Sequence, residues 1–242
     1  MKFITTDGIE VPAVSTLQMI EIDRIAMEET GPNLFQMMEN AGRNLCLLTL
    51  EKLGYKWKTS NILVLAGTGG NGGGGICAAR HLANHGVKVT VCITDPEKLK
   101  EVTAYQLHIL NSTSAEVITI NELQRERPDV ILDAIIGYNL TGEPTGNALK
   151  MIEWASKKSA FITSLDVPSG IDSTTGIKAV NHIQPDATLT LALPKMGLLP
   201  EVSGNLFVAD IGIPIGVYKK LNLNYKYPFG NNFYVKVDFA PT

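Results

Sequence analysis

The sequence predicts a three-layer α/β/α fold with a mainly parallel central sheet. From about residue 61 onward, short apolar segments of strand length alternate with segments of helical periodicity. Seven glycines fall within the nine residues 67–75, directly after the first of these apolar segments. The apolar runs are nearly continuous rather than alternating, which is typical of parallel strands covered by helices on both faces.

Two amphipathic helices are expected before the sheet. Ser15 is a good N-cap for a helix that runs to about Thr30, with apolar residues at helical spacing. Gly31-Pro32 then breaks the chain, and Asn33 can cap a second helix from Leu34 to about Leu53. We expect these helices to precede any strand and to flank the later sheet as a cover or lid.

The repeating strands and helices follow in order. The expected strands are the apolar runs at 61–66, 87–93, 116–120, 129–133, 160–165, 187–193 and 206–208. The expected helices span 76–85, 96–110, 121–127 and 146–157. The segment 67–75 is interpreted as a glycine-rich turn. The Asn- and Tyr-rich tail at 219–242 has no assigned element and is expected to wrap the surface or to contact a partner.

Composition and charge limit the classes of protein to which the chain can belong. The 242 residues are 45% apolar and 19% charged, with no linker, so one domain spanning 1–242 is expected, with its core at about 15–215. The formal charge of -3 disfavours nucleic-acid binding through a basic face. No apolar run approaches the roughly 20 residues that span a bilayer, and the three cysteines form no CxxC pair. A cytoplasmic protein that binds neither membranes nor nucleic acid is therefore expected.

The glycine run is the strongest chemical signal. With nearly every Cβ removed, backbone N–H groups beside a helix start can approach an anionic ligand closely. Gly67, Gly69 and Gly72 also satisfy GxGxxG, and Asp95 stands at the end of the next strand, so an NAD-dependent oxidoreductase is one hypothesis. The lysine of a Walker loop is absent from the run, so hydrolysis of a nucleoside triphosphate is not indicated.

Two carboxylates follow buried strands. Asp133 ends the strand at 129–133, and Asp166 directly follows the strand at 160–165, with Ser169 in the next turn. Ligands bind at the carboxyl edge of open α/β sheets, so these side chains and the glycine run are expected to share one cleft. Asn71, Asp133 and Ser169 would offer only oxygen ligands, which suit potassium, sodium or magnesium ions.

Several motifs resemble those of one known family. The glycine run leads into AARHL at 78–82, ENAGR stands at 39–43, and DAIIG and DVPSG stand at 133–137 and 166–170. KMGL and ADIGIP follow at 195–198 and 209–214. Over about residues 15–215 the chain resembles the NAD(P)H-hydrate epimerases, also called the YjeF N-terminal domain or apolipoprotein A-I-binding protein family.

The resemblance implies a Rossmann-like fold and a repair reaction. Hydrated NADH or NADPH, termed NADHX or NADPHX, is interconverted between its R and S epimers, and a dehydratase then acts on the S form. A homodimer is also implied. By resemblance, a potassium ion is bound by Asn71, Asp133 and Ser169, and Glu143 and Asp166 are the catalytic residues. The implied substrate-binding residues are Gly70, Asn71, Gly72, Gly73, Gly74, Gly137, Tyr138, Asn139, Leu140, Thr141, Gly142, Glu143 and Asp166.

The chain departs from the family's glycine motif, GxGNNGGDG, at two positions. Gly70 replaces its first asparagine, and Gly74 replaces its aspartate. Two side chains are thereby removed from the segment that the resemblance assigns to the substrate. A nucleotide-binding or scaffold module of the same fold, impaired in catalysis, is therefore kept as the alternative to an epimerase.

Overall fold

A computed structural model describes residues 2–240 and places ten strands in one sheet. Their order is β2-β1-β10-β9-β8-β7-β6-β3-β4-β5, and β3 to β9 are all mutually parallel, whereas β1, β2 and β10 pair antiparallel. The strands are β1 Lys2–Thr5, β2 Glu10–Pro12, β3 Asn61–Ala66, β4 Lys88–Ile93, β5 Glu116–Ile118, β6 Val130–Ala134, β7 Phe161–Leu165, β8 Ala187–Leu191, β9 Asn205–Ala209 and β10 Tyr234–Ala240. The predicted α/β fold with a mainly parallel sheet is confirmed.

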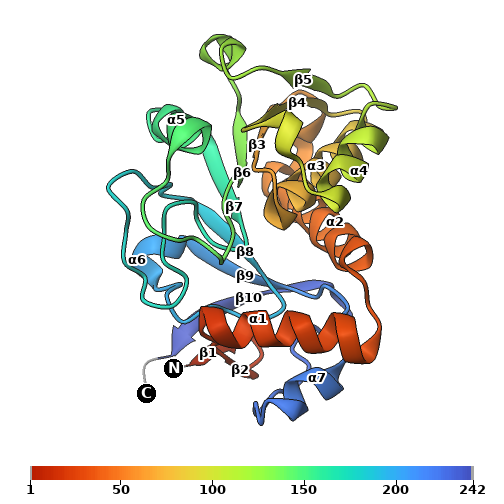
Figure 1. Ribbon diagram of the computed structural model, residues 1–242, viewed down its shortest axis with the longest axis vertical. Helices are drawn as coiled ribbons and strands as arrows, with labels where there is room; N and C mark the ends of the chain where they lie inside the picture. Colours follow the sequence, from red (N-terminus) through yellow and green to blue (C-terminus); the bar gives the residue numbers. More distant parts are fainter. Residues whose placement is uncertain (1, 241–242) are drawn as a thin grey trace.

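The helices cover both faces of this sheet (Figure 1). They are α1 Thr16–Ile25, α2 Leu34–Leu53, α3 Gly70–Asn84, α4 Glu101–Leu110, α5 Gly146–Ala155, α6 Pro200–Ser203 and α7 Ile215–Lys220. Ile62 and Val64 of β3 pack in one apolar cluster with α2 and α3, while Leu63 and Leu65 pack with α5 on the other face. α1 and α7 cover the part of the sheet formed by β9 and β10.

Both N-terminal caps form as predicted. Ser15 and Gln18 make a reciprocal capping box at α1, and Asn33 and Gln36 make one at α2. Each satisfies backbone N–H groups that have no partner inside the helix. The first helix continues as a π-helical turn from Ala26 to Thr30, and it ends at Gly31 with a φ of 103°. Both ends of α1 are thereby fixed in place.

Three strands at the chain ends were missed. The expectation that no strand precedes the two helices is wrong, because β1 and β2 form a hairpin before α1. The tail, which had no assigned element, supplies β10 between β1 and β9. β1 and β2 are short, and β1 pairs with β10 across more than two hundred residues of the chain. Local periodicity carries no signal of such pairing.

The glycine run is mostly helix rather than turn. The helix expected at 76–85 begins six residues earlier, at Gly70, so only residues 67–69 form the connection from β3. The helix expected at 96–110 is a 3₁₀ turn, Pro96–Lys98, followed by α4, and the one expected at 121–127 is the 3₁₀ turn Glu122–Arg125. Glycine has low helix propensity, so the tight packing of α3, rather than its sequence, sets where this helix starts.

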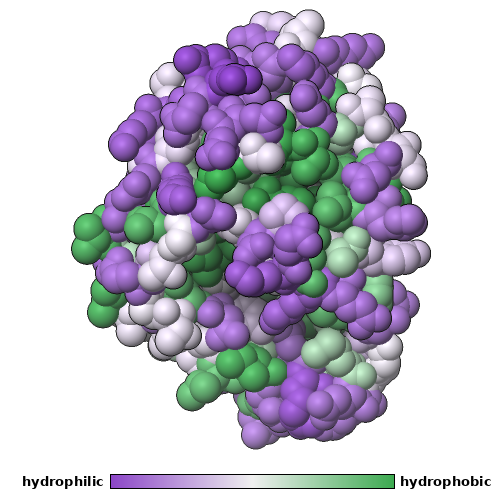
Figure 2. Space-filling model, turned by 45° about the horizontal axis from the view of Figure 1, so that its top comes forward, coloured by the Kyte–Doolittle hydropathy of each residue, from purple (hydrophilic) through white to green (hydrophobic). Residues whose placement is uncertain are grey.

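On one face the surface is mostly polar (Figure 2), and the cysteines are buried. In the face shown in Figure 2, hydrophilic residues cover most of the surface and hydrophobic ones gather toward the middle. Within residues 2–240, no helix combines the length and apolar character needed to cross a membrane. Cys46, Cys77 and Cys92 are buried and unpaired, and burial raises the pKa of the Cys92 thiol to about 12. All three cysteines are therefore small buried side chains of the core.

Candidate functional site

The two strand-end carboxylates and the start of the glycine helix meet at one edge of the sheet. β7, β6 and β3 are neighbours, and Asp166, Asp133 and Gly67 lie at or just beyond their carboxyl ends. The predicted juxtaposition of these three segments is therefore present. It follows from parallel pairing, which aligns the carboxyl ends of successive strands.

A cavity of about 690 Å³ opens at this edge. It lies between α1, α2, the first turn of α3 and the loop after β6, and four methionines on the two N-terminal helices line it, namely Met19, Met27, Met37 and Met38. Of the predicted substrate-binding residues, those lining the cavity are Gly70, Asn71, Gly74, Gly137, Tyr138, Asn139 and Asp166. The N-terminal helices thus form one wall of the cavity, which agrees with their expected role as a cover.

The other predicted substrate-binding residues lie elsewhere. Gly72 and Gly73 are buried inside α3, and Leu140 to Glu143 lie farther along the loop after β6, outside the cavity lining. The exposed carboxylate of Glu143 accepts a hydrogen bond from the backbone N–H of Val180, at 3.1 Å. Binding and catalytic roles for these residues stay predictions.

Asp166 is held by an ion pair that the sequence reasoning did not assign. Its Oδ1 lies 2.5 Å from Nζ of Lys195, and both side chains are almost wholly buried, with exposed fractions of 4% and 0%. Lys195 also donates to the Thr190 hydroxyl and to the carbonyl of Leu191. Its three ammonium protons therefore have three acceptors, as a buried lysine requires.

The backbone of Asp166 is strained. Its φ is 69°, in the left-handed region that non-glycine residues rarely occupy. Oδ2 accepts from the backbone N–H of Tyr138 at 3.0 Å and faces Gly137, where a Cβ would lie 3.2 Å from it. Strain of this kind persists where surrounding contacts enforce it, and it concentrates at functional sites.

Asn71 lies beside this carboxylate. A Cβ on Gly137 would lie 3.2 Å both from Asn71 Cβ and from Asp166 Oδ2, so the two side chains flank the same glycine. Both the amide oxygen and the amide nitrogen of Asn71 are buried and have no hydrogen-bond partner. An unpartnered buried amide costs free energy in the protein alone, so it marks a place where a ligand would complete the contacts.

Asp133 is completely buried behind this position. It accepts hydrogen bonds only from neutral donors: the Ser169 hydroxyl at 2.5 Å, the Ser169 backbone N–H, the Ser164 hydroxyl and the Ile135 N–H. Burial raises the pKa of this carboxyl despite these donors, because no cation faces it. The predicted oxygen ligands Asp133 and Ser169 are thus in direct contact.

A second cavity-lining acid, Asp23 of α1, was also missed. Its Oδ2 accepts a 2.6 Å hydrogen bond from the Tyr138 hydroxyl, and both residues line the cavity. In the sequence, Asp23 is one polar residue on an amphipathic helix, a pattern that also describes a solvated face. Lys195 lay within a recognised motif, but nothing local marked it as buried.

A separate cluster of titratable groups joins α2 to α3. Glu39 accepts from Arg80 at 2.5 Å and contacts Nε2 of His81 at 2.8 Å, and the Cys77 thiol lies 3.3 Å away. Ligand atoms of Glu39, Cys77 and His81 lie within 4.8 Å of one another, a spacing compatible with a metal ion. However, the Arg80 guanidinium already occupies the carboxylate, so this cluster acts as an interhelical tie.

Glu39→Gln is expected to lower the free energy of unfolding at neutral pH and to make it fall less steeply in acid. Burial acts to raise the pKa of Glu39, but hydrogen bonds from Arg80, His81 and Cys77 outweigh it and bring the pKa to about 2. A depressed carboxyl pKa contributes stability that is present above the ordinary value of 4.5 and is lost as the pH falls through 2. At pH 7 the free energy of unfolding of the variant should be about 1 kcal/mol lower than that of wild type. Solvent screening of this partly exposed carboxylate limits the difference.

Urea unfolding of wild type and variant from pH 7 to pH 2.5 measures this effect. The difference in unfolding free energy between the two proteins should shrink over the acid half of the range. Glu153→Gln, on α5, is the matched control, because this side chain is also partly buried but makes no hydrogen bond or ion pair among residues 2–240. A difference that stays constant with pH would contradict the assignment.

The sequence of this chain is similar to those of known proteins of one family. A family model described as YjeF-related protein N-terminus matches residues 34–197. The NAD(P)H-hydrate epimerase of Dehalogenimonas lykanthroporepellens is 47% identical over 98% of this chain and 97% of its own length. That of Nitrosopumilus maritimus is 36% identical over 74% of this chain and 85% of its own.

A solved structure shares the fold. The crystal structure of yeast ynu0 superposes with a TM-score of 0.83 at 26% sequence identity, covering 93% of this chain and 100% of that one. Together with the family model and the relatives, this likeness confirms the resemblance drawn from the sequence motifs. The chain belongs to the YjeF-related protein N-terminus family.

Proposed function

We infer that this protein is an NAD(P)H-hydrate epimerase, an isomerase that interconverts the R and S epimers of hydrated NADH and NADPH. The observation that carries this inference is the 47% identity to an enzyme of that name over nearly the full length of both chains. The alternative is a nucleotide-binding or scaffold module of the same fold, impaired in catalysis. Against a pure scaffold, the cavity keeps a buried ion pair, a strained aspartate and an unpartnered amide, a combination that favours a ligand site.

The cavity suits the reacting half of such a substrate. Its volume of about 690 Å³ lies in the range of small-molecule sites. Its methionines and Ile136 offer apolar contact to a nicotinamide ring, while Asp166 and Asn71 offer polar contact at one end. Epimerisation at a carbon that bears a hydroxyl requires proton transfers, and carboxylates beside an apolar wall are suited to them.

A potassium ion would be held by Asn71, Asp133 and Ser169. The donor set fits, because the Asn71 amide oxygen has no partner and the Asp133 carboxylate is buried without a facing cation. Oxygen ligands are those that hard cations prefer. The ion would supply a fixed positive charge that offsets the burial of Asp133 and orders the first turn of α3.

The wider proposals are a single domain over residues 1–242, a cytoplasmic location and a homodimer. The continuous ten-stranded sheet, which takes strands from both chain ends, supports the single domain. The unpaired buried cysteines are compatible with a reducing compartment. The substrate is taken to be NADHX or NADPHX, without a nucleic-acid or membrane partner.

Incubation with R-NADHX and a dehydratase specific for the S epimer tests the function. The protein should accelerate consumption of the R epimer above its spontaneous rate in potassium buffer. Replacing potassium by choline should lower that rate in wild type, whereas an Asn71→Leu variant should be slow in both salts. A wild-type rate equal to the spontaneous one in both salts would refute the proposed function.

A further inference from the structure

Asp23 and Tyr138 form a hydrogen-bonded pair on the wall of the cavity. Asp23 belongs to α1 and Tyr138 to the loop after β6, so the pair joins two walls of the same cavity. The Tyr138 hydroxyl donates to Asp23 Oδ2 at 2.6 Å, and its oxygen keeps free lone pairs. A hydroxyl in this position can accept a proton from a ligand while it gives its own to the carboxylate.

The surroundings leave Asp23 without a partner cation. The charged and titratable groups that face it are Tyr138, Lys195 and Asp166, together with Tyr218 of α7. Lys195 makes its hydrogen bonds to Asp166, Thr190 and Leu191, so it neutralises Asp166 rather than Asp23. Burial raises the pKa of Asp23 above its ordinary value, despite the hydrogen bond from Tyr138. Burial, and then the charge of Asp23, also raise the pKa of Tyr138, which stays protonated.

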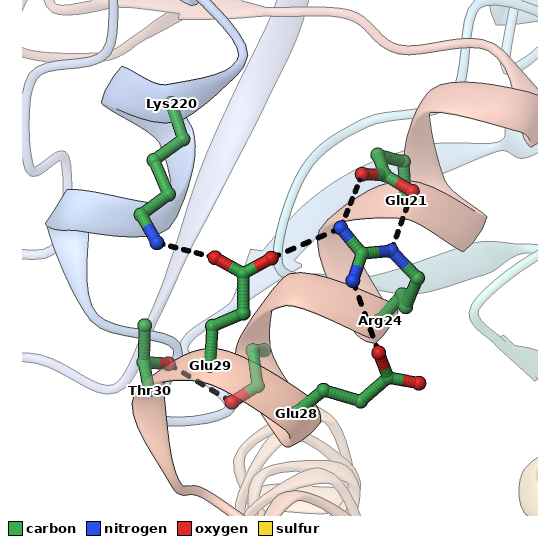
Figure 3. A network of polar contacts seen from close by, with 7 residues as sticks. Glu21, Arg24, Glu28, Glu29, Thr30 and Lys220 are labelled. Atoms are coloured by element: carbon green, nitrogen blue, oxygen red, sulfur yellow. Dashed lines mark hydrogen bonds and ion pairs between the residues drawn. The ribbon is translucent and has the colours of Figure 1, made fainter.

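The neighbouring arginine is also committed elsewhere. Figure 3 shows Arg24 bonded to Glu21, Glu28 and Glu29, and Glu29 bonded in turn to Lys220 of α7. This network holds the outer side of α1 against α7. It keeps the guanidinium in the glutamate cluster and fixes the helix that carries Asp23. The carboxylate therefore faces the cavity as a base with an elevated pKa.

Asp166 is less suited to carry the proton. Its Oδ1 accepts from Lys195 and from the Leu191 N–H, and its Oδ2 accepts from the Tyr138 N–H. Protonating it would break a buried ion pair, which is costly. Asp166 is better suited as a fixed anion that positions the substrate. Asp23 has a single hydrogen bond, and that bond leads into the cavity.

We propose that Asp23, acting through the Tyr138 hydroxyl, is the base that removes and returns the proton of the substrate's ring hydroxyl. This inference rests on the proposed epimerase function and adds its proton carrier. Water adds to an enamine with its hydroxyl on the carbon bonded to nitrogen. The hydroxyl of a hydrated dihydronicotinamide therefore stands next to the ring nitrogen, and the epimers differ at that carbon.

The hydroxyl proton passes to the oxygen of Tyr138 while the Tyr138 proton passes to Oδ2 of Asp23. The oxygen electron pair forms a carbonyl, the bond from that carbon to the ring nitrogen breaks, and its electron pair goes to the nitrogen, conjugated with the carboxamide. After rotation about the adjacent carbon–carbon bond, the nitrogen attacks the other face of the carbonyl. The proton then returns from Asp23 through Tyr138 to the oxygen.

Asp23→Asn is the variant that tests this proposal. It keeps the shape of the side chain and removes the base, so kcat should fall by about 100-fold or more, within the usual range for acid–base groups. KM should change by less than about threefold, because catalysis rather than binding is lost. Tyr138→Phe, which removes the relay hydroxyl, should lose at least about tenfold in kcat. Asp7→Asn makes the same change in the exposed turn between β1 and β2 and should match wild type.

The pH profile separates catalysis from positioning. The active form of Asp23 is ionised, so the wild-type kcat should fall as the pH drops through its raised pKa, above the ordinary 3.8. Asp23→Asn should lose this acid limb, whereas Asp7→Asn should retain it. Thermal unfolding of each variant, with bound NADPH as a ligand probe, shows that the fold and cavity are intact.

Two distinct results would overturn the two inferences. If wild type shows no epimerase activity, the proposed function fails. If wild type is active and folded Asp23→Asn keeps kcat within threefold and the same acid limb, the proposed base fails while the function stands. An Asp23→Asn protein that does not fold is replaced by Asp23→Ser, to which the same criteria apply.

Discussion

Lys195→Met is expected to destabilise the protein by about 3–5 kcal/mol, because it leaves Asp166 as a buried charge without its partner. Methionine preserves most of the apolar volume of the lysine side chain, so the loss reports the missing ammonium rather than a cavity. Lys195 is fully buried, and it also satisfies Thr190 and the Leu191 carbonyl. Urea unfolding at pH 7 measures the change in unfolding free energy.

A double variant distinguishes ion pairing from general disruption. Adding Asp166→Asn to Lys195→Met removes the unpaired charge, so part of the lost stability should return. Lys178→Met, at an exposed position, is the matched control and should change stability by less than about 0.5 kcal/mol. Epimerase activity should be lost in both Lys195 variants, since Asp166 is no longer held. A double variant less stable than Lys195→Met would contradict the buried pair.

Gly72→Ala is expected to destabilise the protein by about 3 kcal/mol, at the upper end of the range for overpacking. A Cβ at Gly72 would lie 1.9 Å from the carbonyl oxygen of Gly67. The obstacle is backbone, and Gly67 is itself fixed, since its own Cβ position lies 2.0 Å from the Ile135 carbonyl oxygen. No side-chain rotation can relieve the clash, so the connection from β3 to α3 must move.

Gly70→Ala is the matched control on the same helix. The nearest atom to a Cβ at Gly70 is Met38 Cε, at 3.9 Å, which is ordinary contact. This variant should match wild type or gain slightly, because alanine favours the helix more than glycine does. Thermal and urea unfolding of both variants provide the comparison. Equal stability of the two variants would contradict the close backbone approach at Gly72.

Much of the fold could be predicted because its signals are local. Ser15 and Asn33 are caps whose chemistry is visible in four residues, and most strands from β3 to β9, though not the short β5, are apolar runs. Asp133 and Asp166 could be placed at one edge because parallel pairing aligns strand ends. The start of α3 was misjudged, because seven glycines argue against a helix unless the packing around them is known.

The site was harder to complete, because its remaining members act through nonlocal contacts. Lys195 becomes significant only through Asp166, and Asp23 only through Tyr138, partners far away along the chain. A lysine after an apolar strand and an aspartate on an amphipathic helix are both common at surfaces. Their burial depends on which elements close over them, which local periodicity does not specify.

The interleaving of the chain ends in the sheet has a consequence for biosynthesis. β10 lies between β1 and β9, so β1 and β2 join the sheet only through a strand translated more than two hundred residues later. During translation, residues 2–12 can form their hairpin but have no strand that connects them to β9 until residues 234–240 emerge. Contacts of such long sequence separation form slowly, and the nascent chain exposes two strand edges meanwhile. Completion of the ten-stranded sheet therefore waits until β10 has been translated.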